Sequence, residues 1–342
     1  MDSKRLEAIS IDEPLLVTGA TGFLGSRTLE RLASLPGKAR MIASGRTLRA
    51  NAQVHSTQVT YQLGDLSDRE YVDALISENG IKTIIHCAAL SSPWGAEEDF
   101  FRANVLAQQN LIAAAELHGV DRFIYISTPS LYVNHQDQVG ISEADPLPKV
   151  MVNAYARTKR QAEKLLEVSG LNWVALRPRA LIGRGDTVIM PRILRAYHAG
   201  RLRIIGDGKN RVDLTPVSNV VDAILLAMTA PDEAMRRPYN ISNGDPVPLW
   251  EGISYILQKL GLAPPTQQVP YPLLFHLAGF MEWRARNFQQ NREPLLTRYG
   301  VSTLARSFSL DITQAQLQLG FVPQQTVWEA IDEFAEWYQE DK

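Results

Sequence analysis

Short apolar runs alternate with helix-forming segments along the first half of the chain. Runs of four to six mostly apolar residues predict strands at 14–17, 39–44, 58–63, 82–87 and 122–127. Between them, residues 26–32 and 100–117 carry apolar side chains at helical spacing. Strands that alternate with helices favour a parallel sheet, and the run 82–87 is typical of a strand covered on both faces. We therefore predict an α/β fold with a doubly wound parallel sheet.

The pattern changes after about residue 180. Residues 217–222 open a further helix, and residues 238–242 predict a strand that returns to the sheet. The rest of the second half predicts a smaller, mostly helical lobe. We expect the chain to divide into a flexible tail (1–13), a sheet domain (14–180, with 212–245 returning to it) and the smaller lobe (181–211 and 246–342).

The composition excludes several classes of partner. The chain has 342 residues, of which 45% are hydrophobic, and a formal net charge of -2. This near balance of positive and negative charge gives no reason to expect nucleic acid as a partner.

We also expect no signal peptide and no membrane-spanning helix, because no apolar run is long enough. The single cysteine, Cys87, suits a reducing compartment, so we expect a cytoplasmic protein. The scattered histidines predict no metal site.

A glycine-rich turn follows the first predicted strand and opens the first helix. Its sequence is TGATGFLG, from Thr18 to Gly25. Gly19 is free to adopt the positive φ of a tight turn, Gly22 leaves room for a pyrophosphate, and Gly25 lets the helix pack close to the strand. The helix N-terminus then presents unpaired N–H groups to phosphate. The turn predicts a dinucleotide site, and the residues expected to contact the cofactor here are Gly19, Thr21, Gly22, Phe23, Leu24 and Gly25.

The end of the second predicted strand bears on the choice of cofactor. In dinucleotide-binding folds an acidic residue near this point accepts hydrogen bonds from the ribose of NAD. Here the chain has Ser44, Gly45 and Arg46 instead. Because a guanidinium matches the geometry of phosphate, Arg46 favours NADP(H), with NAD(H) as the alternative. Arg46 as an ordinary solvated loop charge is the other interpretation.

Two further strand ends supply candidate cofactor contacts. Asp65 and Leu66 follow the third strand, where an aspartate commonly borders the adenine pocket, and we expect Ser67 to cap the next helix. The small residues Ala88 and Ala89 follow the fourth strand and would let the middle of the cofactor pass close to the backbone.

A tyrosine and a lysine provide the candidate chemistry. Tyr155 and Lys159 are four residues apart on a strongly helical segment, so they share one face. An adjacent ammonium favours the phenolate and lowers the pKa of the phenol toward neutrality. A hydroxyl at the end of the fifth strand, from Ser127 or Thr128, would hold the substrate oxygen beside the phenol. His86 is better explained as a hydrogen-bonded core residue.

With these motifs in place, the chain resembles the extended short-chain dehydrogenases/reductases from residue 14 onwards. The family's glycine motif matches Thr18–Gly25, and its active-site tyrosine and lysine match Tyr155 and Lys159. Its active-site serine or threonine lies four residues before an aromatic residue, here Tyr132, which selects Thr128 over Ser127. The resemblance implies a Rossmann-type sheet, acid/base chemistry at Tyr155, ribose binding by Lys159, a nicotinamide contact at Pro178, and a homodimer.

Several stretches resemble the branch that includes 3-beta-hydroxysteroid dehydrogenases, sterol-4-carboxylate dehydrogenases and 2-alkyl-3-oxoalkanoate reductases. They are residues 177–187, 206–211 and 292–297. This resemblance implies an NADP(H)-dependent oxidoreductase that interconverts a ketone and a secondary alcohol on a hydrophobic 3-oxo or 3-hydroxy substrate. The competing branch is the nucleotide-sugar epimerases with tightly bound NAD. A non-catalytic regulator on the same fold is disfavoured by the intact tyrosine and lysine.

Candidate substrate contacts are few. Ser91 and Pro129 follow the fourth and fifth strands. Arg211 would bind a substrate carboxylate or, in the alternative branch, a diphosphate, unless it is a surface charge.

We expect the apolar and aromatic segment 271–286 to pack as a lid or core helix. An interfacial helix in peripheral contact with a membrane is the alternative.

Overall fold

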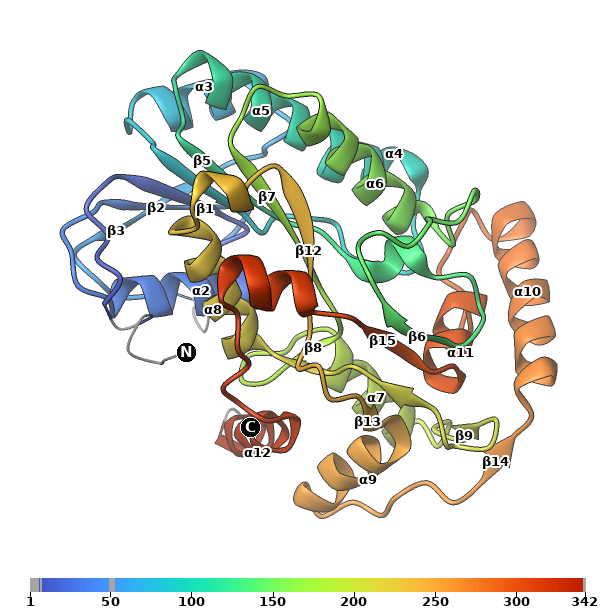
Figure 1. The fold of residues 1–342 in the computed structure, drawn as a ribbon. Helices are drawn as coiled ribbons and strands as arrows, with labels where there is room; N and C mark the ends of the chain where they lie inside the picture. Colours follow the sequence, from blue (N-terminus) through green and yellow to red (C-terminus); the bar gives the residue numbers. More distant parts are fainter. Residues whose placement is uncertain (1–5, 7, 49–52, 341–342) are drawn as a thin grey trace.

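A seven-stranded parallel sheet forms the centre of the computed structural model, which describes residues 6, 8–48 and 53–340 (Figure 1). The strand order is β12-β7-β5-β4-β1-β2-β3. The strand bounds are β1 Leu15–Thr18, β2 Met41–Gly45, β3 Val59–Leu63, β4 Thr83–His86, β5 Arg122–Ile126, β7 Trp173–Pro178 and β12 Arg237–Ile241. The order reverses between β1 and β4, and ligands of such sheets bind at the carboxyl ends of the strands near this point.

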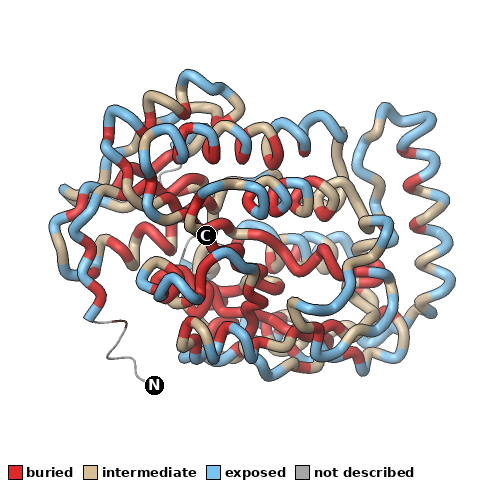
Figure 2. Tube along the Cα trace, turned by 45° about the horizontal axis from the view of Figure 1, so that its top comes forward, coloured by how far each residue is buried: buried red, intermediate tan, exposed pale blue. Residues whose placement is uncertain are grey.

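Helices cover both faces of the sheet, which explains why its strands are so apolar. On one face, α2 (Phe23–Ala33) and α8 (Val217–Met228) join the sheet in one hydrophobic cluster. On the other face, α3 (Arg69–Ser77), α5 (Ala107–Leu117) and α6 (Ala154–Glu167) join it in a second cluster. Figure 2 shows buried residues between these layers and exposed residues on the outer sides of the helices. The predicted doubly wound α/β fold is confirmed.

The smaller lobe combines helices with short strands. Its helices are α7 Ile189–His198, α9 Leu249–Lys259, α10 Tyr271–Phe288, α11 Arg298–Ala305 and α12 Val327–Glu340. Its main sheet has the order β13-β10-β15-β6, formed by β6 Gln138–Ile141, β10 Arg211–Val212, β13 Val247–Pro248 and β15 Phe308–Leu310. Two further strand pairs are β8 Leu181–Ile182 with β11 Thr215–Pro216, and β9 Ile204–Ile205 with β14 Gln268–Val269. In the described part of the chain, no helix is both long enough and apolar enough to cross a membrane.

The helix expected at 100–117 contains a π-helical segment. A first turn, α4 (Glu97–Phe100), is followed by π-helical residues Phe101–Leu106 and then by α5. Asn104 lies in the π-helical segment, and its side chain bonds the backbone N–H and C=O of Leu90 and the hydroxyl of Thr158. This amide therefore ties the loop after β4 to α6.

Two sequence-based expectations about boundaries need correction. The segment 1–13 is not a flexible tail throughout, because Ile9 and Ile11 are buried in the core and Ile11 exchanges backbone hydrogen bonds with Pro36 and Ala39. Residues 138–141, placed in the sheet domain, instead pair with β15 of the smaller lobe. Both errors come from contacts between segments far apart in sequence.

Candidate active site

The turn between β1 and α2 leaves no room for a side chain at Gly19 or Gly25. Gly19 has a φ of +65°, and a Cβ placed on it would lie 2.7 Å from the backbone nitrogen of Ala88. A Cβ on Gly25 would lie 2.2 Å from the carbonyl oxygen of Gly19. These close approaches are backbone to backbone, so the glycines cannot be replaced without moving β1, β4 or α2.

A cavity of about 570 Å³ opens beside this turn, at the carboxyl ends of β1, β2, β3 and β4. Eight of the predicted cofactor residues line it, namely Gly19, Thr21, Gly22, Arg46, Asp65, Leu66, Ala88 and Ala89. Six do not line it, namely Phe23, Leu24, Gly25, Tyr155, Lys159 and Pro178. The glycine and alanine lining fits the adenosine and pyrophosphate part of a nicotinamide dinucleotide.

Arg102 is a lining residue that the sequence gave no reason to select. Its guanidinium donates to Asp65 at 2.6 Å and to the hydroxyl of Ser67 at 2.8 Å. Ser67 also donates its backbone N–H and its hydroxyl to Asp65, and these bonds together with Arg102 lower the pKa of the Asp65 carboxyl.

The predicted N-terminal cap of α3 is wrong by one residue. Asp68, not Ser67, accepts hydrogen bonds from the first N–H groups of this helix.

Tyr155 lies among other hydroxyl groups. It sits at the start of α6, which Asn153 caps by accepting from Ala156 N at 2.8 Å. The Ser91 and Thr128 side chains lie close enough to the phenol to act on its pKa. Desolvation raises the pKa of Tyr155, and these two side chains act in the opposite direction. The structure thus brings together three of the predicted site residues, from the loop after β4, the end of β5 and α6.

Lys159 is buried on α6 and held at the end of β5. Its ammonium donates to the carbonyl oxygen of Ile126 at 2.6 Å and lies 4.0 Å from the ring centroid of Tyr125. Burial lowers the pKa of Lys159 to about 7, although the nearby Glu163 carboxylate acts to raise it. The action of Lys159 on the pKa of the Tyr155 phenol stays a prediction.

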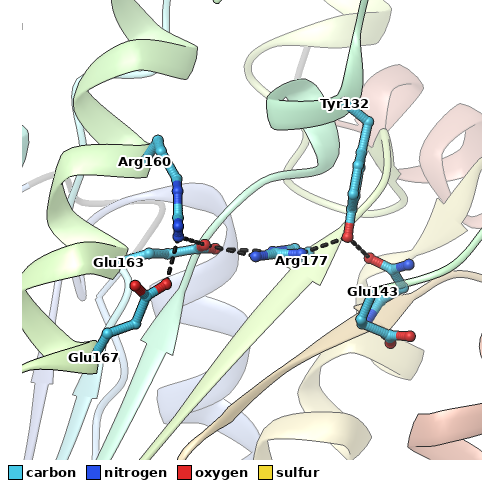
Figure 3. A network of polar contacts seen from close by, with 7 residues as sticks. Tyr132, Glu143, Arg160, Glu163, Glu167 and Arg177 are labelled. Carbon is cyan, nitrogen blue, oxygen red and sulfur yellow. Dashed lines mark hydrogen bonds and ion pairs between the residues drawn. The ribbon is translucent and has the colours of Figure 1, made fainter. Parts of the chain in front are cut away.

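A buried polar network involves α6, the helix that carries Tyr155 (Figure 3). Arg177 on β7 donates to both carboxylate oxygens of Glu163 on α6, at 2.9 and 2.6 Å. The same guanidinium donates to the hydroxyl of Tyr132, which in turn donates to Asn240 on β12 at 3.2 Å. Figure 3 shows Arg177 between Glu163 and Tyr132. The network joins the helix that carries Tyr155 to two strands of the sheet.

Three other residues singled out in the sequence have clear positions. His86 is buried, and its Nδ1 lies 2.6 Å from the hydroxyl of Thr18, while burial lowers its pKa to about 3. It is a neutral core residue, as expected. Pro129 is buried at the start of the 3₁₀ turn Pro129–Tyr132, directly beside Thr128. Arg211 is exposed and donates to the carbonyl oxygen of Pro246, so these contacts give no support to a role in substrate binding.

Comparison with known proteins identifies the family. A family model described as the NAD dependent epimerase/dehydratase family matches residues 15–242. The chain belongs to this family. The predicted membership of the extended short-chain dehydrogenases/reductases, and with it the prediction of a nicotinamide-dependent enzyme, is confirmed.

The curated relatives cover nearly the whole chain. An uncharacterized protein of Escherichia coli, YbjS, is 34% identical over 95% of this chain and 98% of its own length. A 2-alkyl-3-oxoalkanoate reductase of Stenotrophomonas maltophilia is 32% identical over 93% of this chain and 97% of its own. A 3beta-hydroxysteroid-dehydrogenase/decarboxylase of Arabidopsis thaliana is 28% identical over 96% of this chain and 81% of its own. The resemblance to this branch is thereby confirmed.

Solved structures share the fold. The epimerase Mth375 of Methanothermobacter thermautotrophicus is 19% identical, with a TM-score of 0.78 over 99% of this chain and 95% of its own. MoeE5, solved with UDP-glucuronic acid and NAD, is 27% identical, with a TM-score of 0.75 over 97% of this chain and 100% of its own. The predicted Rossmann-type architecture agrees with both.

The shifted pKa of Lys159 predicts a pH dependence of stability. Because the folded pKa of about 7 lies below the ordinary value of 10.5, the unfolded chain binds more protons between these two pH values. Stability contributed through this group therefore rises with pH across that window. We expect the free energy of unfolding of the wild type, relative to a Lys159→Met variant, to increase from pH 7 to pH 10.5. Denaturant unfolding of both proteins across the range measures this, and a constant difference would contradict it.

Proposed function

We propose that this enzyme is an NADP(H)-dependent oxidoreductase that interconverts a ketone and a secondary alcohol on a hydrophobic 3-oxo or 3-hydroxy substrate. The observation that carries the proposal is the position of the Tyr155 phenol near the side chains of Thr128 and Ser91, together with a glycine-lined cavity whose lining includes Leu90, the residue before Ser91. The 2-alkyl-3-oxoalkanoate reductase relatives support the substrate class.

Each residue has its own role in the proposed reaction. The glycine turn and Arg46 would hold the dinucleotide, whose nicotinamide would supply or accept the hydride. Tyr155 gives its proton to the carbonyl oxygen in reduction and takes it back in oxidation. Thr128 and Ser91, whose side chains lie near the phenol, hold the substrate oxygen beside it. Because desolvation keeps the pKa of Tyr155 raised, the phenol is protonated at neutral pH and ready to act as an acid.

A nucleotide-sugar epimerase is the second candidate, favoured by the 27% identity to MoeE5, which was solved with the sugar nucleotide UDP-glucuronic acid and NAD. Two observations weigh against it. Arg211, the candidate diphosphate ligand, is exposed and bonded to Pro246. The 2-alkyl-3-oxoalkanoate reductase relatives are more similar in sequence to this chain than MoeE5 is.

Replacing Tyr155 by Phe tests the mechanism. The change removes the proton donor and leaves the ring, so turnover of a 2-alkyl-3-oxo acid should fall at least about 100-fold. The dissociation constant of NADPH, followed by its fluorescence, should stay close to that of the wild type. Turnover that survives the substitution would rule out Tyr155 as the acid.

Replacing Arg46 by Ala tests the choice of cofactor. The Arg46 side chain is exposed at the cavity beside Gly45, where a ribose phosphate would lie. Loss of a charge-assisted phosphate contact should weaken NADPH binding roughly tenfold or more and leave NADH binding nearly unchanged. Fluorescence titration with each cofactor separates the two effects. Equal weakening of both would argue against a phosphate role.

Helix α10 supplies a candidate membrane contact. One side of it is packed, since Ala278, Glu282 and Ala285 are buried. The other side exposes large apolar residues, namely Leu273, Leu277, Phe280, Trp283 and Phe288. Arg284 and Arg286 are exposed at the same end of the helix, which suits an anionic lipid surface.

Co-sedimentation with vesicles tests this contact. The wild type should bind vesicles that contain an anionic lipid, and binding should fall when Phe280 and Trp283 are both changed to Ser. A variant with Leu117, exposed on α5, changed to Ser serves as the control for loss of an exposed apolar side chain. Equal binding by all three proteins would exclude α10 as the contact.

A further inference from the structure

Arg102 reaches the cofactor cavity from an irregular part of its wall. It lies in the π-helical segment Phe101–Leu106, between α4 and α5. The cavity is lined by Arg102 and Ala103 of this segment, by Asp99 before it and by Ala107 after it. π-Helical turns inside longer helices are rare and occur frequently at functional sites. A charged residue of this segment that lines the cavity is therefore a candidate ligand contact.

The sheet order places Arg102 at the outer end of the cavity. Its guanidinium bonds Asp65 and Ser67, which follow β3 at the edge of the sheet, two strands away from β1. The pyrophosphate of a dinucleotide binds at the glycine turn after β1, and its adenosine ribose lies near the end of β2. The base lies beyond the ribose, so the adenine comes to the end of β3, beside Asp65 and Arg102.

Arg102 and Asp65 form a donor and an acceptor side by side. Nη2 of Arg102 donates to Oδ2 of Asp65 at 2.6 Å, and Nε donates to the hydroxyl of Ser67 at 2.8 Å. These bonds use two of the five N–H groups of the guanidinium. Oδ1 of Asp65 accepts from the backbone N–H and the hydroxyl of Ser67 at 2.9 and 2.8 Å. Among the described residues only Arg102 donates to Oδ2, so this oxygen keeps an acceptor site for a ligand.

Both side chains stay accessible to a ligand, since 64% of the Arg102 side chain and 42% of the Asp65 side chain are exposed. Exposed ion pairs of this kind add little to the free energy of unfolding, so folding alone does not explain the pair. Hydrogen bonds from Ser67, together with the Arg102 guanidinium, lower the pKa of Asp65. Its carboxylate is therefore ionised at neutral pH and accepts hydrogen bonds without donating any.

The edge of adenine complements such a pair. Its exocyclic amine donates hydrogen bonds, and the ring nitrogen N7 beside it accepts one. In hypoxanthine a carbonyl oxygen replaces this amine, and the Asp65 carboxylate would then face a second acceptor. A carboxylate that is held in place beside a guanidinium therefore favours adenine over hypoxanthine.

We propose that Arg102 is a specificity-determining residue for the cofactor, which holds the Asp65 carboxylate against the amine of adenine so that the two side chains read the base as a unit. The proposal concerns binding of the dinucleotide alone. It needs only that the cavity holds the adenosine part of a nicotinamide dinucleotide, which the family and the cavity lining support. It is independent of the substrate, of Tyr155, and of the choice between NADP and NAD.

Dinucleotides that differ only in the base test this role. NADPH, NADH and the analogue of each in which hypoxanthine replaces adenine are titrated by nicotinamide fluorescence. The wild type should bind each adenine form at least about tenfold more tightly than its analogue, because the analogue lacks the N–H that the site binds. Arg102→Ala should reduce this preference to within about twofold in both pairs. Arg102→Lys keeps the charge of the cavity but loses the planar fork, so it should keep only part of the preference.

Two further variants show whether Arg102 acts through Asp65. In an Asp65→Asn background, Arg102→Ala should change the preference for adenine much less than it does in the wild type. Arg40→Ala is the matched control. This exposed arginine precedes β2, at the opposite end of that strand from the cavity, and donates to the carbonyl oxygen of Asn79 at 3.0 Å. Its loss should leave the preference unchanged.

The remaining outcomes contradict the proposal. A wild type that binds both bases equally, or binds no dinucleotide, would overturn it, and so would a preference that survives Arg102→Ala. If Arg102→Ala weakens NADPH and its analogue equally and leaves both forms of NADH unchanged, Arg102 is a ligand of the ribose phosphate instead. Because every readout is a dissociation constant, loss of the base preference and failure of the proposed reaction are separate results.

Discussion

The ion pair between Arg177 and Glu163 is the contact on which the arrangement of the site depends. Both side chains are almost completely buried, with Arg177 4% and Glu163 2% exposed. Two parallel hydrogen bonds join them, and the guanidinium also holds Tyr132. Loss of one partner from such a pair costs about 3–5 kcal/mol, since it leaves a buried charge uncompensated. The pair therefore locks α6 onto β7 and the 3₁₀ turn that follows Thr128.

Tyr155, Lys159 and Thr128 are each held by an element of this network or by a residue directly next to one. Tyr155 and Lys159 are two turns and one turn before Glu163 on α6, and Thr128 and Ser130 lie at the turn that contains Tyr132. Tyr132 reaches Asn240, whose side chain also donates to Ile141 of the lobe sheet. The sheet domain and the smaller lobe are thus connected through the same set of buried polar groups. The geometry around Tyr155 follows from these contacts.

Much of the fold was predictable because its signals are local. The apolar runs, the glycine turn and the spacing of Tyr155 and Lys159 each lie within a few residues of sequence, and the strands and α6 formed as expected. Eight of the predicted cofactor residues also line the cavity, because the strand ends of a parallel sheet meet at one edge. The family resemblance selected Thr128 over Ser127 because Thr128 lies four residues before Tyr132, and in the structure the Thr128 side chain lies close enough to the phenol to act on its pKa.

The remaining features depend on contacts between distant segments. Tyr299 meets Ser130 across 169 positions, and Arg102 meets Asp65 across 37, so no local pattern could select either. Ile11 looked like part of a polar tail, but it packs beside Gly37. The surroundings of Lys159 also depend on such contacts. Four-residue spacing puts Tyr155 and Lys159 on one face of the helix, but it does not reveal that the ammonium contacts the carbonyl of Ile126 and the ring of Tyr125.

The most direct test of the proposed reaction is consumption of the reduced cofactor by the purified protein. NADPH would be mixed with a 2-alkyl-3-oxo acid in one assay and with UDP-glucose in another, and the loss of nicotinamide absorbance and the sugar products would be followed. The account predicts stoichiometric oxidation of NADPH with the oxo acid and no change with UDP-glucose. Epimerisation of the sugar nucleotide without net cofactor oxidation, together with no reaction of the oxo acid, would contradict it.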